Sequence, residues 1–166
     1  MKKLILLALL LGGLPTFAQK TFEVYNYTAY TVQLADIATK VATGTYPEFH
    51  SKPSGLISIP PGGSYTLVNT ANLYRFPFLS PSSSPTIPTW ERLNSASPPT
   101  TYLPSATAWP LGTSQVFKEL FFFVGGAYQN ISVTSPSLPL QSGGWQADYV
   151  EDNPAPNVWF YTIVIY

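Results

Sequence analysis

The sequence contains no cysteine and a single histidine, His50. Disulfides and thiolate metal ligands are therefore excluded, and the Cys/His clusters that hold structural zinc cannot be assembled. Charged residues make up only 10% of the chain and form no basic cluster, which argues against a nucleic-acid partner. Beyond the N-terminus there is neither a long apolar run nor a sustained helical period, so the sequence predicts no transmembrane helix in the mature chain.

The first residues have the order expected of an export signal. Lys2 and Lys3 precede a short apolar run from Leu4 to Leu14, and the small residues Thr16 and Ala18 follow it. This pattern predicts a signal peptide over residues 1–18 and export to a secreted or periplasmic location. Loss of the two lysines lowers the basic count from 8 to 6 against 8 acidic residues, giving the mature chain a net charge of −2.

The remaining segment, 19–166, has the size of one domain. It comprises 148 residues, enough to bury a real core without covalent cross-links. Phe, Tyr and Trp account for 15% of the chain, and each such ring buries about 150–250 Å² when fully packed. We therefore expect aromatic packing to replace disulfides in holding the domain together.

Short runs of β-branched and aromatic residues recur between Pro, Gly, Ser and Asn. Such runs are the signature of strands, and their spacing predicts an all-β fold, an antiparallel β-sandwich of about seven to nine strands. The C-terminal run lacks polar alternation, which is typical of a central strand covered on both faces. The main runs are 21–25, 30–35, 55–59, 64–69 and 157–166.

The stretch KELFFFVGGAYQNISV (118–133) predicts a hairpin with a two-residue turn at Gly125 and Gly126. In that register Val124 faces Ala127 and Phe123 faces Tyr128. Since side chains alternate across a strand, three consecutive phenylalanines must occupy both faces. This predicts an inner strand whose outer face is covered by a loop.

The segment 77–110 contains eight prolines with many serines and threonines. Because proline cannot donate to a ladder, we expect no strands here. The segment also carries tryptophans and leucines that a free linker would not need. It predicts a long, ordered, Pro/Ser-rich loop packed over one face of the sandwich.

The pieces TFEVYNYTAYTVQ and IPPGGSYTL resemble the amino-terminal strands of thaumatin-like proteins. Members of that family begin with similar strands and a similar Pro/Gly turn, so the resemblance implies a β-sandwich that begins in this way. The family is disulfide-rich, whereas this chain has no cysteine, and no acidic cleft is matched. The resemblance therefore implies no activity and no site.

Four aromatic residues form the candidate ligand-binding set. Trp90, Tyr102 and Trp109 lie in the Pro-rich segment, and Trp145 lies in a second, Gly-rich loop. Flat rings beside hydroxyl and amide groups suit stacking on sugar rings or holding a peptide. The alternative is that these rings anchor the loops to the core.

The acidic stretch DYVEDN offers a candidate Ca²⁺ site through Asp148, Glu151 and Asp152, since Ca²⁺ takes six to eight oxygen ligands. The alternative is a solvated turn before Pro154. His50 is expected in a surface loop, and no serine occupies a G-x-S-x-G motif, so no catalytic residue is predicted.

These observations favour an exported, non-catalytic binding or cell-surface protein whose partner is a carbohydrate or a protein surface. Two alternatives stay open. One is an outer-membrane or pore-forming β protein, suggested by the aromatic C-terminal residue Tyr166. The other is a hydrolase with an unrecognised site. An exposed strand edge would also permit self-association.

Overall fold

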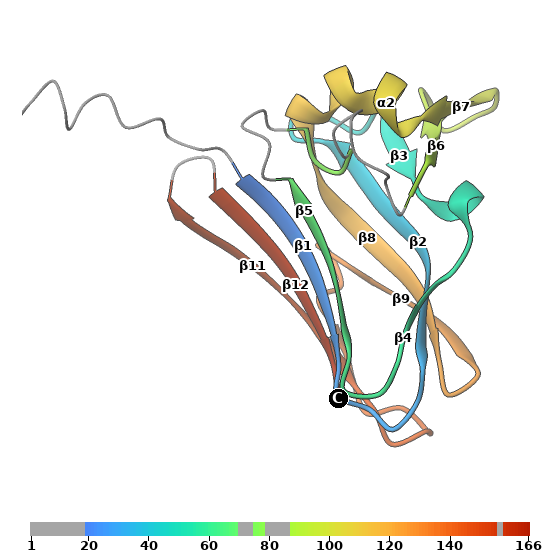
Figure 1. The fold of residues 1–166 in the computed structure, drawn as a ribbon, viewed down its shortest axis with the longest axis vertical. Helices are drawn as coiled ribbons and strands as arrows, with labels where there is room; N and C mark the ends of the chain where they lie inside the picture. Colours follow the sequence, from blue (N-terminus) through green and yellow to red (C-terminus); the bar gives the residue numbers. More distant parts are fainter. Residues whose placement is uncertain (1–18, 70–74, 79–86, 156–157) are drawn as a thin grey trace, which may run out of the picture.

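The computed structural model describes residues 19–69, 75–78, 87–155 and 158–166, and its strands form two stacked sheets (Figure 1). The expected signal peptide lies outside the described residues. The smaller sheet has the order β10-β11-β12-β1-β5, and the larger has the order β7-β6-β3-β2-β8-β9, with β4 also paired to β2. The predicted all-β sandwich is therefore confirmed.

A strand lies at each predicted run, but the run 30–35 belongs to a longer strand that continues to Val41. The nine-residue strand Ala147–Ala155 was not predicted, and it occupies the acidic stretch for which the alternative interpretation was a solvated turn. The smaller sheet consists of β1 (Gln19–Asn26), β5 (Ser64–Asn69), β10 (Ser137–Leu138), β11 (Ala147–Ala155) and β12 (Val158–Ile165). The larger sheet consists of β2 (Val32–Val41), β3 (Glu48–His50), β4 (Ile57–Ile59), β6 (Thr89–Leu93), β7 (Thr100–Pro104), β8 (Gln115–Val124) and β9 (Ala127–Ser132). The helical turns are η1 (Lys52–Ser54), α2 (Ser105–Ala108) and η2 (Trp109–Ser114).

One pair of strands departs from the expected antiparallel arrangement. The first and last strands, β1 and β12, run parallel, with Gln19 opposite Val158 and Asn26 opposite Ile165. A tight hairpin would force antiparallel pairing, but strands from the two ends of the chain have no short connection to satisfy. Their relative direction is therefore free to follow the packing.

The hairpin at residues 118–133 forms in the predicted register. Val124 lies opposite Ala127 and Phe123 opposite Tyr128. Gly125 and Gly126 both have positive φ, +56° and +81°, which a two-residue turn of this kind requires of its central residues. Strand β8 is an inner strand between β2 and β9, also as predicted.

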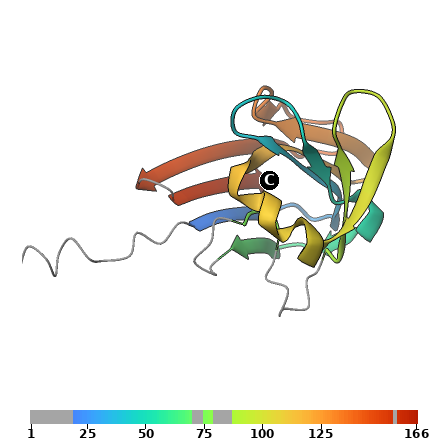
Figure 2. The same ribbon diagram turned by 90° about the horizontal axis from the view of Figure 1, so that it is seen from above.

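The Pro-rich segment differs from the prediction, because part of it enters the larger sheet. Strands β6 and β7 pair from Thr89 opposite Pro104 to Leu93 opposite Thr100. The prolines are tolerated because β7 is the sheet edge, where one side of the strand needs no donors, and because Pro98 and Pro99 lie in the connecting turn. Residues 89–104 therefore widen the larger sheet at its edge (Figure 2), whereas 79–86 lie outside the described residues.

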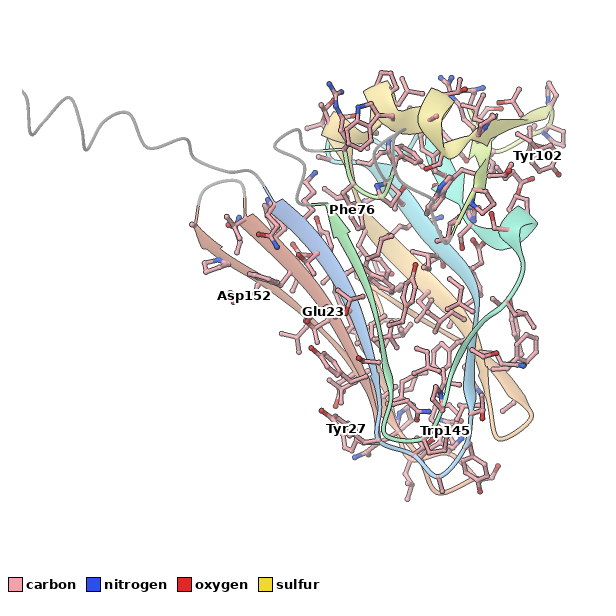
Figure 3. The ribbon with its side chains drawn as sticks, in the orientation of Figure 1. Glu23, Tyr27, Phe76, Tyr102, Trp145 and Asp152 are labelled. Carbon is pink, nitrogen blue, oxygen red and sulfur yellow. The ribbon has the colours of Figure 1, made fainter. Side chains whose placement is uncertain are left out.

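The core is a single cluster of buried side chains from both sheets, rich in rings. Phe22 of β1 stacks on Phe117 of β8 with ring centroids 5.2 Å apart, and Phe117 lies 5.9 Å from Tyr161 of β12. Phe76, labelled between the sheets in Figure 3, contacts Tyr161 at 5.2 Å. The sheets lie close together near the C-terminus and diverge towards the end covered by α2 (Figure 1).

Candidate functional site

A cluster of buried charged side chains lies on the outer face of the larger sheet, centred on His50. Contrary to the predicted surface loop, His50 belongs to strand β3 and is only 8% exposed. Its Nδ1 lies 2.7 Å from Oδ2 of Asp36 on the neighbouring strand β2, and its Nε2 lies 3.4 Å from Oε2 of Glu48. Both ring nitrogens therefore face carboxylates.

Asp36 also holds the segment that follows β3 by hydrogen bonds to its backbone. Its Oδ1 accepts hydrogen bonds from the backbone N–H of Ser51 at 2.9 Å and of Lys52 at 3.3 Å. The hydroxyl of Ser51 in turn accepts from the N–H of Ile37 at 2.7 Å. A β-bulge at Ala35 shifts the register of β2 just before Asp36. The cluster is therefore held by backbone groups as well as by charge.

Burial and the neighbouring groups set the pKa of His50, and the positive charge of Lys52 opposes the protonated form. Burial lowers this pKa, since desolvation disfavours the charged imidazolium, while the hydrogen bond and charge of Asp36 raise it and the bond to Glu48 adds to the rise. The net result is a pKa above the ordinary value of 6.5. The two carboxylates thus hold a proton on the ring to higher pH than in a free histidine.

The other charges of the cluster are paired internally. Nζ of Lys118 on β8 lies 2.9 Å from Glu48 and 3.0 Å from Glu119. Nζ of Lys52 lies 2.7 Å from Glu91 on β6. Every carboxylate in the group therefore has a basic partner, so the surface offers hydrogen-bonding groups of both kinds without a large unbalanced charge.

A ridge of three aromatic rings borders this cluster. Phe121 and Phe123 stand on the outer face of β8, and Tyr128 stands opposite Phe123 on β9. Tyr128 lies parallel to Phe121, with centroids 5.9 Å apart and a 14° angle between planes, and 4.7 Å from Phe123. Both phenylalanines are half-buried, whereas Tyr128 is 54% exposed. The predicted loop does not bury these rings.

The aromatic ridge and the charged side chains line a pocket of about 530 Å³ that is open to solvent. This volume is within the usual range for small-ligand sites. Ala35, the residue at the bulge, contributes a small side chain to its wall, which leaves the space free. The other lining residues are Asp36, His50, Lys52, Glu119, Phe121, Phe123 and Tyr128.

The four aromatic residues predicted to bind a ligand do not come together. Trp90 and Trp145 are each 1% exposed and belong to the core, so their faces contact other side chains. Trp109 is partly buried against the core, and Tyr102 is 62% exposed. Tyr102 and Trp145 lie at opposite ends of the molecule (Figure 3). For Trp90 and Trp145 the arrangement matches the alternative that such rings anchor their segments to the core.

The acidic residues predicted to hold Ca²⁺ are also separated. Asp148, Glu151 and Asp152 lie on β11, whose register with β12 is continuous over these positions. Alternation places Glu151 on the opposite face from Asp148 and Asp152. Across the described residues, no group of three or more His, Cys, Asp or Glu side chains is placed to hold a metal ion.

Sequence reasoning missed the pocket because its polar residues come from separate strands. The only local signal was the spacing of Glu48 and His50, which puts both side chains on one face of a strand. The aromatic ridge was visible in the hairpin register, but it was expected to be covered.

Comparisons with known proteins give no relatives. No family model, no curated protein and no solved structure matches the chain. No helix in the described part of the chain has the length and apolar character that crossing a bilayer requires.

Proposed function

We propose that this chain is an exported, non-catalytic binding protein that holds a carbohydrate in the pocket on the outer face of the larger sheet. The observation that carries the proposal is the ridge of Phe121, Phe123 and Tyr128 beside the His50 cluster. A pyranose ring has a face of C–H groups that packs on an aromatic ring, and hydroxyls that both donate and accept hydrogen bonds. The pocket supplies both kinds of contact.

The charge pattern favours a neutral ligand. The carboxylates of Asp36 and Glu119 and the ammonium of Lys52 already have partners of opposite sign. An ionic ligand would have to displace one of these pairs, whereas sugar hydroxyls add to them without breaking the pairing. This reasoning supports a neutral glycan over a charged peptide.

Binding without catalysis is supported by the state of His50. Both of its ring nitrogens lie near carboxylates, so neither is available to take a proton from a ligand. The neighbouring residue Ser51 is 3% exposed, and its hydroxyl accepts a backbone hydrogen bond. It is therefore not placed as a nucleophile.

Replacing Tyr128 by alanine is expected to weaken binding to a neutral glycan by about tenfold or more, since burying one aromatic side chain contributes roughly 1.5–3 kcal/mol. Affinity for immobilised neutral polysaccharides would be measured with the mature chain. Tyr128→Ala should cost less than about 1 kcal/mol of stability, the scale of one cross-strand aromatic pair.

Tyr27→Ala is the matched control, because Tyr27 is 64% exposed and lies on the smaller sheet's side of the molecule (Figure 3). It should leave binding unchanged. A second variant, Ala35→Phe, fills the pocket and should also abolish binding. Equal retention of the wild type and the three variants on the polysaccharide would overturn the proposal. Release of a cleaved sugar would show an enzyme instead.

A further inference from the structure

The outer edge of β11 is largely unpaired. Strand β10 pairs with only two residues of this edge, with Leu138 opposite Ala147 and Ser137 opposite Asp148. Beyond them, the part of the chain that the structure describes places no strand beside 150–155, and each of these residues is exposed. An open edge of this length is a template for pairing with another strand.

The free backbone groups on this edge can be assigned. The N–H of Tyr149 donates to the carbonyl of Pro136 at 2.7 Å, on the β10 side. In an antiparallel ladder both backbone groups of alternate residues point to the same side. The N–H and C=O of Glu151 therefore point to the open edge as well.

A second hollow lies beside this edge, where the two sheets diverge. It has a volume of about 300 Å³, and residues of both sheets line it. Trp159 of β12 stacks over Tyr161 with centroids 6.4 Å apart, and Phe117 of β8 continues the aromatic wall. The remaining lining residues are Lys40, Ala42, Val116, Val133 and Glu151.

The geometry of the edge fixes which side chains of an added strand would enter the hollow. Glu151 shares the face of Tyr149, which packs against Phe117 in the core and whose hydroxyl donates to Glu151 at 2.7 Å. Alternate residues of a strand paired with β11 would point to that same face. They would meet the apolar wall, while the others would lie beside Asp152 on the outer side.

Charge decides between a second copy of the chain and a different partner. Asp152 is exposed on the outer face of the smaller sheet (Figure 3), and Glu151 is exposed next to it. Antiparallel pairing of two copies through this edge would bring these carboxylates close to their own equivalents, which is unfavourable. A strand with basic residues on its outer face would instead be attracted.

We propose that the β11 edge is a docking site for an extended cationic segment of a partner protein. The segment adds a strand to the smaller sheet, with apolar side chains in the hollow beside Trp159 and Lys or Arg side chains facing Asp152. Main-chain hydrogen bonds to Glu151 supply affinity, and the alternating side chains supply selectivity. This site is separate from the proposed carbohydrate pocket.

The test uses a synthetic hexapeptide that alternates lysine and valine. Two matched peptides accompany it: one alternates glutamate and valine, and the other is the lysine peptide with every backbone N–H methylated. The unmethylated lysine peptide should bind most tightly, and it should slow hydrogen exchange at the Glu151 amide about tenfold or more. Each control peptide should bind at least about tenfold more weakly.

A protein variant tests the charge argument. Asp152→Lys should weaken binding of the lysine peptide about fivefold and strengthen that of the glutamate peptide. Glu23→Lys, the same change on the outer face of β1, should alter neither. Equal binding of the methylated peptide, or protection away from β11, would overturn the proposal. So would self-association through this edge without peptide binding.

Discussion

Replacing Asn26 by alanine is expected to lower the free energy of unfolding by about 3 kcal/mol, because the side chain is a fully buried hub of hydrogen bonds. Its Nδ2 donates to the carbonyls of Tyr30 at 2.8 Å, Ile59 at 3.0 Å and Pro60 at 3.0 Å. Its Oδ1 accepts from the N–H and the hydroxyl of Thr28, at 3.0 and 2.8 Å. Alanine would leave the carbonyl of Ile59 and the N–H of Thr28 buried without their partner.

The position of Asn26 explains why the effect should be large. The chain passes from the smaller to the larger sheet between β1 and β2, and returns between β4 and β5. Asn26 ties the two crossings together, since its N–H donates to the carbonyl of Gly63 and its carbonyl accepts from Gly62. The side-chain amide bridges the same two crossings through Tyr30 on one side and Ile59 on the other, so its loss weakens both connections while the backbone bonds remain.

Urea unfolding of a chain comprising residues 19–166 measures this loss. Asn130→Ala is the matched control, since Asn130 is exposed on β9, and it should change stability by less than about 0.5 kcal/mol. Similar midpoints for the two variants would show that the hub of Asn26 contributes little.

Local patterns predicted the elements whose geometry is decided within a few residues. The Gly125–Gly126 hairpin was correct at every pair because turn chemistry and side-chain alternation specify one register. The gap between the predicted runs 21–25 and 30–35 indicated where β1 ends, but the sequence did not show that the next strand joins the other sheet. That outcome depends on contacts from 59–63, far along the chain.

The Pro-rich segment shows why a local rule failed. Proline disfavours a strand only where its missing donor is needed, and that depends on whether the strand lies at an edge. The position of β7 at the edge of the larger sheet depends on tertiary contacts with other strands. The sequence of 77–110 alone contains no sign of it.

The candidate pocket was hidden for a related reason. Asp36, His50 and Glu119 come from three strands, and only their pairing across the sheet makes them neighbours. Conversely, Trp90 and Trp145 were considered for binding because they lie in irregular sequence, yet both are buried. Burial of a ring depends on the elements around it, which composition does not reveal.

Replacing His50 by glutamine is expected to destabilise the protein by about 3 kcal/mol at mildly acidic pH, because it removes the cation between two buried carboxylates. Asp36 is 6% exposed and Glu48 is 5% exposed, so water screens them little. Glu48 retains Lys118 and Asp36 retains its two backbone donors, which limits the loss. Lys52→Gln also takes the partner from a buried carboxylate, since Glu91 is 6% exposed, but it leaves His50 in place. Its cost should therefore lack the pH dependence expected of His50→Gln.

The cost of His50→Gln should depend on pH with a definite sign. The folded-state pKa of His50 lies above the ordinary value of 6.5, because the opposing effect of burial is outweighed by Asp36 and Glu48. Its stabilising contribution is therefore complete below pH 6.5 and is lost as the pH rises through the folded pKa. Lys20 also titrates near this range, because burial lowers its pKa to about 8. Both proteins contain Lys20, so subtracting their free energies of unfolding at each pH removes its contribution. Because the chain has a single histidine, NMR titration of the imidazole gives the folded-state pKa of His50 directly. If the difference in free energy of unfolding between the wild type and His50→Gln stayed constant as the pH passed through that pKa, the stabilising role of the protonated His50 would be contradicted.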